Sequence, residues 1–196
     1  MIDEPARCWW FGAASLRPDP LMVEYHDSEW GVPCHDDLEL FERLALESFQ
    51  AGLSWSTILR KRDGFRAAFG GFDPTTVASL TEADRGRLMA DAAIVRNRAK
   101  IDATINNARA FLAVAAEFGT FDAYLADMVP PPPRRLPPEA TTADVPATTP
   151  TSDALSRDLR VRGFRFVGPT IVYAFMQSVG LVDDHVPGCF RYGVTG

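Results

Sequence analysis

Four residues of the types that bind zinc lie near the two ends of the sequence. His185 and Cys189 are four positions apart near the C-terminus, and Cys8 and His26 lie near the N-terminus. Two thiolates and two imidazoles form a common tetrahedral ligand set for Zn²⁺. A metal held by these residues would join the two ends of the chain and close a very long loop, which removes conformational entropy from the unfolded state.

The spacing of these residues alone leaves other interpretations open. Single cysteine and histidine residues are usually ordinary core or surface residues, and Cys34 with His35 forms a rival ligand pair. The chain holds three cysteines, an odd number that argues against a disulfide framework. If four protein ligands bind the metal, no coordination position stays open for water, and the metal is structural rather than catalytic.

The elements that must position these residues are predicted to be helices separated by short turns. Segment 36–51 is predicted to be an amphipathic helix, in which Leu40, Leu44, Glu47 and Ala51 lie at helical spacing. Further helices are expected at 54–69, 81–91, 97–118, 152–161 and 168–179, and one more begins at Asp73-Pro74.

The segment 128–150 differs from the rest of the chain in composition. It contains the run PPPPRRLPP and a tail rich in Thr, Ala and Pro, so we expect an extended surface loop there. The piece after it is small for a domain and is expected to fold back onto the first part. No stretch alternates apolar and polar residues convincingly. The expected fold class is therefore all-α, a helical bundle that forms a single domain over residues 1–196.

Composition limits the classes of function that fit. The chain has 196 residues, of which 46% are hydrophobic and 23% charged, as in ordinary globular proteins. Its net charge of −6 argues against a strongly basic nucleic-acid binder, although it leaves room for a local basic face. The most apolar stretch, 166–182, is interrupted by Gly168, Pro169 and Gln177, so we expect no membrane span. Because the first residues lack the pattern of a secretory signal, the expected compartment is the cytoplasm.

Five stretches of the sequence, taken together and in order, resemble one enzyme family. They are RCWW at 7–10, YHDSEWGVP at 25–33, LFERLALESFQAGLSW at 40–55, DAAIVRNRAKI at 91–101 and RGFRFVGPTIVYAFMQSVGLVDDHVPGCFRY at 162–192. The family is 3-methyladenine DNA glycosylase I, within the helix-hairpin-helix superfamily. The resemblance covers nearly the whole chain apart from the proline-rich loop.

The resemblance implies a bundle of helices whose termini are joined by a structural zinc ion. By motif match the ligands are Cys8, His26, His185 and Cys189, which leaves the 34–35 pair as ordinary turn residues. Enzymes of this family hydrolyse the N-glycosidic bond of 3-methyladenine in DNA and leave an abasic site. Because the alkylated base is cationic and already a good leaving group, the enzyme mainly flips the nucleotide out of double-stranded DNA, recognises the base and admits water. We expect a monomer.

The resemblance also implies the residues of a base pocket. Glu47 matches the family's pocket glutamate, and its apolar helix neighbours suggest a partly desolvated carboxylate that contacts a cationic adenine. Trp55 and Tyr25 resemble residues that stack on the two sides of the base, where electron-rich rings attract a cationic purine. Trp10 and Trp30 flank zinc ligands and are weaker pocket candidates. Without the resemblance, Glu47 would be interpreted as a solvated helix residue and the aromatic residues as core.

The tight turn at 50–53 is expected to enter the DNA. By resemblance this turn, which contains Gln50, Gly52 and Leu53, supplies the wedge that fills the gap left by the flipped nucleotide. Leu53 can intercalate as an apolar side chain, and Gln50 can reach the orphaned base. The alternative is a simple helix terminator.

The segment 91–101 resembles the hairpin that holds a DNA phosphate through backbone N–H groups at a helix N-terminus. Arg96, Arg98 and Lys100 are expected to add positive charge beside it. Ala93 stands where the family usually has glycine. If the turn needs a positive φ at that position, alanine costs on the order of 1 kcal/mol.

The sequence offers neither a catalytic aspartate after the hairpin nor a good lyase nucleophile. Segment 164–175 contains no acidic residue, and Lys100 is the only lysine near the hairpin. We therefore expect a monofunctional glycosylase. Three alternatives stay open: a protein that binds alkylated DNA without cleaving it, an unrelated zinc-dependent hydrolase, and the same chemistry on another lesion such as 3-methylguanine.

Overall fold

The computed structural model describes residues 5–8, 19–131 and 133–194, and these are mostly helical. The α-helices are α1 (Pro20–Ser28), α2 (Asp37–Gln50), α3 (Trp55–Ala68), α4 (Pro74–Ala78), α5 (Glu82–Ala90), α6 (Arg98–Phe118), α7 (Phe121–Met128), α8 (Pro150–Val161) and α9 (Pro169–Ser178). The remaining described elements are the 3-10 turns η2 (Gly70–Phe72) and η3 (Thr142–Asp144) and the strands β1 (Arg134–Arg135) and β2 (Val182–Asp183). This content agrees with the expected all-α class. Among the described helices, none combines the length and apolar character needed to cross a bilayer.

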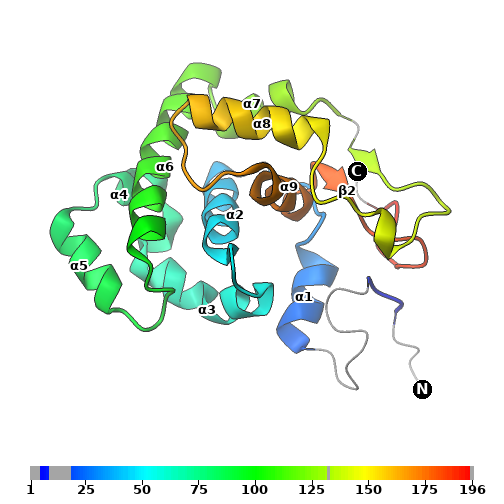
Figure 1. Ribbon diagram of the computed structural model, residues 1–196, viewed down its shortest axis with the longest axis horizontal. Coiled ribbons are helices and arrows are strands. Elements are labelled where there is room, and N and C mark those ends of the chain that lie inside the picture. Colours follow the sequence, from blue (N-terminus) through cyan, green and yellow to red (C-terminus); the bar gives the residue numbers. More distant parts are fainter. Residues whose placement is uncertain (1–4, 9–18, 132, 195–196) are drawn as a thin grey trace.

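Helix α2 lies at the centre of the molecule, in contact with α3, α6, α7 and α9 (Figure 1). It begins after Asp36, whose side chain accepts hydrogen bonds from the backbone N–H groups of Leu38 and Glu39. Every residue from Leu40 to Phe49 is buried, as expected of a helix surrounded on all sides. The polar residues of that run are therefore held inside the protein.

Most of the expected helices are confirmed to within a few residues. The segments 36–51, 54–69, 81–91, 97–118, 152–161 and 168–179 correspond to α2, α3, α5, α6, α8 and α9. Asp73 caps α4 as expected, and its side chain accepts a hydrogen bond from the backbone N–H of Thr76. Gly119, with a φ of 92°, ends α6 in a conformation that favours glycine.

Helices α1 and α7 were not expected from apolar periodicity. They have 9 and 8 residues, which is too short for a convincing apolar repeat. Helix α1 begins at Asp19-Pro20, with the same capping aspartate and first-turn proline as α4. Helix α7 follows Thr120, whose side chain accepts a hydrogen bond from the backbone N–H of Ala123.

The proline-rich segment is largely irregular, as expected, but it also makes fixed contacts with the rest of the protein. Strand β1 pairs in parallel with β2, so that Arg134 lies opposite Val182 and Arg135 opposite Asp183. Leu136, directly after β1, is buried. Strands of two residues are too short to produce an alternating sequence pattern. The pairing fixes the loop beside the last segment of the chain.

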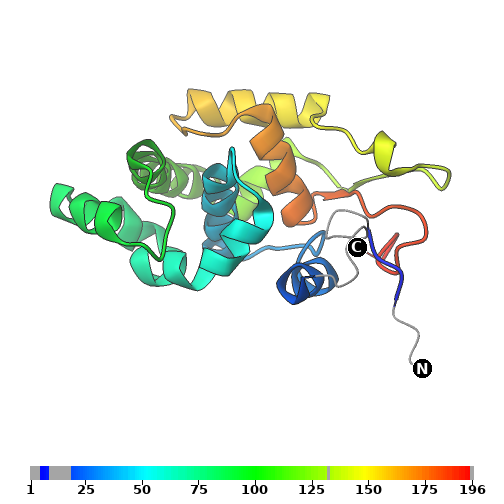
Figure 2. The same ribbon diagram turned by 60° about the horizontal axis from the view of Figure 1, so that its bottom comes forward.

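The part of the chain after the loop folds back onto the first part, as expected. Helix α9 packs against α2 and α8, and residues from Leu40 to Val182 contribute to one hydrophobic core. Figure 2 shows the first described residues beside the C-terminal segment. There the backbone N–H of Phe190 donates to the carbonyl of Ala6 over 2.9 Å.

Candidate active site and metal centre

Four buried side chains from the two ends of the chain meet at one point. One ligand atom from each of Cys8, His26, His185 and Cys189 lies within 4.8 Å of the others. His26 lies in the last turn of α1, and His185 follows shortly after β2. The arrangement predicted from residue types at the two termini is confirmed as a cluster that could hold a metal ion.

The histidine rings are oriented as metal ligands require. The Nδ1 atom of His26 lies 2.7 Å from a carboxylate oxygen of Asp27, and its Nε2 atom faces Cys189. The Nε2 atom of His185 lies 3.2 Å from the backbone oxygen of Trp30, and its Nδ1 atom faces the thiols. With the proton of each ring on the outer nitrogen, each ring presents a lone pair to the cluster, as in metal sites.

The two thiols complete a donor set that fits zinc. A hydrogen bond with the Cys8 thiol lowers the pKa of Cys189, and hydrogen bonds with His185 and His26 lower it further. The same contact raises the pKa of Cys8. One thiol of the pair therefore gives up its proton readily, and the thiolate is the form that binds metals. Two nitrogen and two sulfur donors fill a tetrahedron, so an ion bound here would be structural.

The rival pair lies elsewhere in the molecule. The Cys34 thiol is 3.5 Å from the Glu39 carboxylate, and the Nδ1 atom of His35 lies 3.0 Å from a carboxylate oxygen of Asp122. Neither residue joins the buried cluster.

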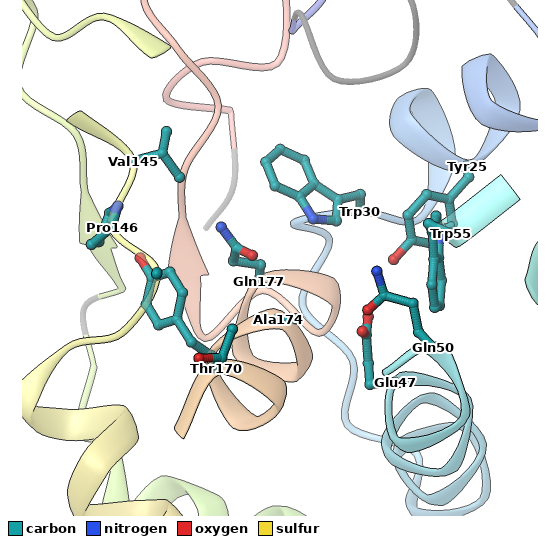
Figure 3. A pocket seen from close by; sticks show the side chains of 12 residues that line it. Tyr25, Trp30, Glu47, Gln50, Trp55, Val145, Pro146, Thr170, Ala174 and Gln177 are labelled. Carbon is teal, nitrogen blue, oxygen red and sulfur yellow. The ribbon is translucent and has the colours of Figure 1, made fainter. Parts of the chain in front are cut away.

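A cavity of about 320 Å³ lies between α2 and α9. It is lined by Tyr25, Trp30, Glu47, Gln50, Trp55, Val145, Pro146, Ala147, Thr170, Tyr173, Ala174 and Gln177. Figure 3 shows Glu47, Gln50, Tyr25 and Trp55 on one side of it and side chains of α9 and of the proline-rich segment on the other. Trp30 links the cavity to the metal cluster, because its ring centroid lies 4.6 Å from that of His185.

Glu47 is the acidic residue among those that line the cavity. It is 4% exposed, and burial raises the pKa of Glu47 from 4.5 to about 8. Within the described part of the chain, no hydrogen bond or ion pair reaches its carboxylate. The partly desolvated acid expected at this position is thus fully buried. A strongly shifted carboxyl in a cavity is typical of a functional site.

Two of the aromatic residues that line the cavity contact each other. The ring centroids of Tyr25 and Trp55 are 5.2 Å apart and the rings are tilted by 50°, so the rings contact each other on one wall. The rings are thus side by side in this conformation, and the expectation that they stack on opposite sides of a base stays a prediction. The indole N–H of Trp55 is buried and has no hydrogen-bond partner among the described residues. Trp30 lines the cavity, whereas Trp10 lies outside the described residues.

The turn 50–53 joins α2 to α3 at the edge of the cavity. Gly52 has a φ of 83°, a conformation that favours glycine. Leu53 is 40% exposed, and Gln50 lines the cavity. An apolar side chain is thus exposed on the turn beside the cavity, and its insertion into DNA as a wedge stays a prediction.

Lys100 lies behind this turn rather than on an exposed surface. Its ammonium group donates to the backbone oxygens of Phe49 and Ala51 over 2.8 and 2.6 Å. These carbonyls belong to the end of α2, where helical partners are absent. Burial lowers the pKa of Lys100. The expected phosphate contact is therefore corrected: Lys100 supports the turn from inside.

The segment 91–101 connects α5 to α6. The guanidinium group of Arg98 pairs with Glu82 at 2.8 Å and with Asp102 at 3.0 Å. Arg96 is exposed. Much of the positive charge expected here is therefore already neutralised by neighbouring carboxylates.

Ala93 does not carry the strain that a positive φ would impose. Among the described non-glycine residues, positive φ values occur at Phe72 and Phe166. Gly64 of α3 leaves the room that Ala93 occupies, since a Cβ atom built at Gly64 would lie 2.8 Å from the Cβ atom of Ala93. Alanine is therefore accommodated without the cost considered from the sequence.

The second wall of the cavity was not predicted from the sequence. Tyr173 and Gln177 are four residues apart on α9 and therefore share a face. Asp184 accepts hydrogen bonds from both side chains, and Arg134 pairs with Asp184 at 2.8 Å. The only sequence signals were the spacing on α9 and the position of Asp184 beside a metal ligand. Residues 145–147, which also line this wall, carry no such signal.

Comparison with curated proteins identifies close relatives over nearly the full length. The chain is 48% identical over 186 residues to DNA-3-methyladenine glycosylase 1 of Escherichia coli (strain K12), which covers 95% of this chain and 96% of the relative. It is 43% identical over 185 residues to DNA-3-methyladenine glycosylase of Haemophilus influenzae, with 93% and 96% of the two chains covered.

Solved structures give the same result. A crystal structure of 3-methyladenine DNA glycosylase I superposes with a TM-score of 0.89 at 46% identity, covering 95% of this chain and 100% of the other. The Staphylococcus aureus enzyme, in a structure that describes 3-methyladenine recognition, superposes with a TM-score of 0.86 at 37% identity, covering 92% and 96%. The family model for methyladenine glycosylase matches residues 15–192. The chain belongs to the methyladenine glycosylase family.

Proposed function

We propose that this chain is a DNA glycosylase that hydrolyses the N-glycosidic bond of 3-methyladenine in alkylated double-stranded DNA and leaves an abasic site. The observation that carries the proposal is the buried carboxylate of Glu47, which has no hydrogen-bond or ion-pair partner among the described residues and lies in a cavity walled by aromatic rings. Such a cavity suits a flat, cationic ligand. Relatives at 48% and 43% identity are named for this activity.

Glu47 would select the base by its charge. Methylation at N3 makes adenine cationic while it is attached to the sugar. A cation beside a buried carboxyl group favours the ionised form, so the bound lesion and ionised Glu47 would stabilise each other. A normal, neutral adenine would leave the carboxylate without a compensating charge. Trp55 would add cation–π attraction from the same wall.

The reaction needs little further acid–base chemistry from the protein. Water adds at C1′ of the sugar as the bond from C1′ to N9 breaks, the bonding electron pair stays on N9 so that the base leaves as neutral 3-methyladenine, and the added water releases one proton to solvent. The two lysines of the chain are unsuited to an additional lyase step. The Lys100 ammonium group is held by two carbonyls, and Lys61 donates to the backbone oxygen of Ala92 over 2.8 Å. A monofunctional enzyme is consistent with these contacts.

To reach the cavity, the nucleotide would leave the duplex by base flipping. The exposed Leu53 would fill the space in the stack, and Gln50 would face the orphaned base. The contacts of Lys100 with the end of α2 would keep this turn in place while it is inserted.

The connection between α8 and α9 is a stronger candidate for the phosphate-binding hairpin than segment 91–101. In segment 91–101, Asn97 caps the start of α6, because its side chain accepts a hydrogen bond from the backbone N–H of Lys100. At the start of α9, Gly168 provides no side-chain cap, so the first N–H groups keep their capacity to bind an anion.

The loop before α9 is also held rigidly from behind. Asn106 donates to the backbone oxygen of Gly163 over 2.7 Å, and Asn107 to that of Arg165 over 2.8 Å. The Ser48 hydroxyl, next to Glu47 on α2, donates to the backbone oxygen of Phe166 over 3.0 Å. A phosphate bound here would therefore be placed at a fixed position relative to the base cavity.

A zinc ion held by Cys8, His26, His185 and Cys189 would act as a cross-link. With four protein ligands it would leave no position for water, and its chemistry would be limited to joining the two ends of the chain. The cross-link would fix Trp30, whose backbone oxygen lies 3.2 Å from the Nε2 atom of His185 and whose ring lines the cavity.

Incubation with methylated duplex DNA, followed by chromatography of the released bases, tests the proposed activity. We expect release of 3-methyladenine by the natural sequence and strongly reduced release by Glu47→Gln. Glu42→Gln, which changes a buried glutamate on the other side of the same helix, serves as the control. If the folded, metal-loaded protein binds the DNA but releases no base, the catalytic proposal is wrong and a binding function replaces it.

A further inference from the structure

A fixed amide group faces Glu47 across the cavity. The Nε2 atom of Gln177 donates a hydrogen bond to the Oδ2 atom of Asp184 over 2.9 Å. An ionised carboxylate can only accept hydrogen bonds, so the amide nitrogen is the atom that must face Asp184. The Oε1 atom of Gln177 is therefore turned away from Asp184, on a side chain that lines the cavity. Figure 3 shows Gln177 on the opposite side of the cavity from Glu47, with its amide nitrogen directed away from Glu47.

Asp184 is held in place by charge and by hydrogen bonds. It is 1% exposed and forms an ion pair with Arg134 at 2.8 Å. The hydroxyl of Tyr173 donates to its Oδ2 atom over 2.5 Å. Both partners donate to the carboxylate and hold it in one position, from which it accepts the hydrogen bond of the Gln177 amide nitrogen.

The backbone at Gln177 is also fixed. Its carbonyl oxygen accepts a hydrogen bond from the backbone N–H of Gly31 over 3.0 Å. This bond ties the end of α9 to the residue after Trp30, at the edge of the same cavity. The position of the amide and its rotation are therefore both determined by the protein before any ligand binds.

We propose that Gln177 is a specificity-determining residue of the base pocket and that Asp184 is its positioning residue. The Oε1 atom of Gln177 accepts a hydrogen bond from the 6-amino group of an adenine-type base. A guanine-type base carries a carbonyl oxygen at that position, which has no proton to donate. The inference rests on the proposed function and deepens it: Glu47 selects for positive charge, which 3-methyladenine and 3-methylguanine share in DNA, whereas Gln177 separates the two bases.

The test compares the two bases on the natural sequence and on Gln177→Met, which keeps the side-chain length but removes the acceptor. Binding of free 3-methyladenine and free 3-methylguanine is followed by tryptophan fluorescence, since Trp30 and Trp55 line the cavity. We expect the preference for 3-methyladenine to fall by about tenfold in Gln177→Met, the loss typical of one well-formed base contact. An unchanged ratio of the two affinities would overturn the inference.

Asp184→Asn tests the positioning role while Gln177 stays in place. The amide introduced at position 184 can face Gln177 with either its oxygen or its nitrogen. The amide of Gln177 is then no longer held in one orientation, and the preference for 3-methyladenine over 3-methylguanine should fall. Asp183→Asn is the matched control, because Asp183 is equally buried and accepts a hydrogen bond from the backbone N–H of the same metal ligand, His185, but pairs with Arg135 instead. Zinc content and melting temperature are measured for both variants. Equal loss of preference in the two would show that the effect passes through the metal centre, which contradicts a positioning role.

The outcomes also separate this inference from the proposed function. If the natural sequence neither binds 3-methyladenine nor releases it from methylated DNA, the proposed function fails. If it does both, and Gln177→Met discriminates the two bases as well as the natural sequence, only the assignment of Gln177 fails.

Discussion

The two sides of α2 each bury a glutamate, and the protein surrounds the two carboxylates very differently. Glu42 is 3% exposed and Glu47 is 4% exposed. The Nε atom of Arg62 donates to Glu42 over 2.5 Å, and that of Arg66 donates to it over 2.9 Å. Glu47 instead faces the cavity beside aromatic rings.

The difference in partners separates the two acids by several pKa units. Burial raises the pKa of Glu42, but hydrogen bonds from Arg66 and Arg62 outweigh this effect and hold that pKa below its usual range. Burial, with no hydrogen-bond partner in the described part of the chain, raises the pKa of Glu47 to about 8. Equal burial thus gives a structural acid on one side and, on the other, an acid whose charge is kept available for a ligand. An unpartnered buried acid lowers stability, so its retention points to function.

The largest effect should come from Glu47→Gln. Removal of the ionisable group is expected to reduce single-turnover release of 3-methyladenine by about 100-fold or more, the usual effect of losing a positioned ionisable group. The melting temperature should not fall, because the unpaired acid contributes no stabilising contact. A reduction in the rate of release of less than about fivefold would contradict the assigned role, because a change of that size can come from an effect on substrate binding alone.

Glu42→Gln should show the opposite pattern. It leaves two arginines beside a neutral amide, and we expect the free energy of unfolding to fall by about 3 kcal/mol, as when one partner of a buried ion pair is removed. Denaturant unfolding at neutral pH measures the change. Base release below the melting transition should stay close to that of the natural sequence. A stable variant that has lost activity would reverse the roles assigned to the two sides of α2.

The two acids should also give stability opposite dependence on pH. Between pH 4.5 and about 8 the native state keeps the Glu47 proton that the unfolded chain has released, so stability falls as pH rises through this window. The slope is about 1.4 kcal/mol per pH unit for one group. Glu47→Gln removes this slope and should therefore be more stable than the natural sequence at pH 8, by a margin that vanishes near pH 4.

Glu42 has a lowered folded pKa, so its stabilising contribution is present at neutral pH and is lost as pH falls through that pKa. The destabilisation in Glu42→Gln should accordingly be full at pH 7 and shrink in acid. Unfolding curves of both variants and of the natural sequence from about pH 2 to about pH 8 measure the two trends. Parallel curves for the two variants would show that the two carboxyl groups have similar pKa values.

The rate of base release should rise with pH for the same reason. Only ionised Glu47 attracts the cationic lesion, and with a pKa of about 8 a minor fraction is ionised at pH 7. The apparent second-order rate constant reports the free enzyme, so it should increase by up to about tenfold between pH 7 and pH 9 and then level off. Glu47→Gln should show a low, flat profile. A rise that persists in Glu47→Gln would assign the titration to another group.

The local sequence does not distinguish Glu42 from Glu47. Apolar periodicity placed both glutamates on one predicted helix. Leu44 lies between them in the sequence and does not distinguish one from the other. The arginines that neutralise Glu42 come from α3. Gly52 indicates a turn before α3, but no local pattern encodes the direction in which α3 then packs against α2. Only the family resemblance separated Glu47 from Glu42.

The same reasoning explains the other successes and errors. The metal ligands could be found because their residue types are rare and chemically specific. Lys100 was misassigned because its charge suggested a phosphate, whereas its long side chain reaches back to the end of α2. The contact of Arg134 with Asp184 joins segments far apart in the chain, so the second wall of the cavity appeared only in the folded structure.

The smallest effect expected on α2 comes from Arg66→Ala. The side chain of Arg66 is 45% exposed, so solvent screens its pairing with Glu42. Arg62, at 15% exposure, stays in place and also pairs with Glu29. We therefore expect Arg66→Ala to lower the free energy of unfolding by less than about 1 kcal/mol, with base release unchanged. A loss as large as that of Glu42→Gln would mean that Arg66, and not the buried Arg62, supplies most of the compensation that distinguishes Glu42 from Glu47.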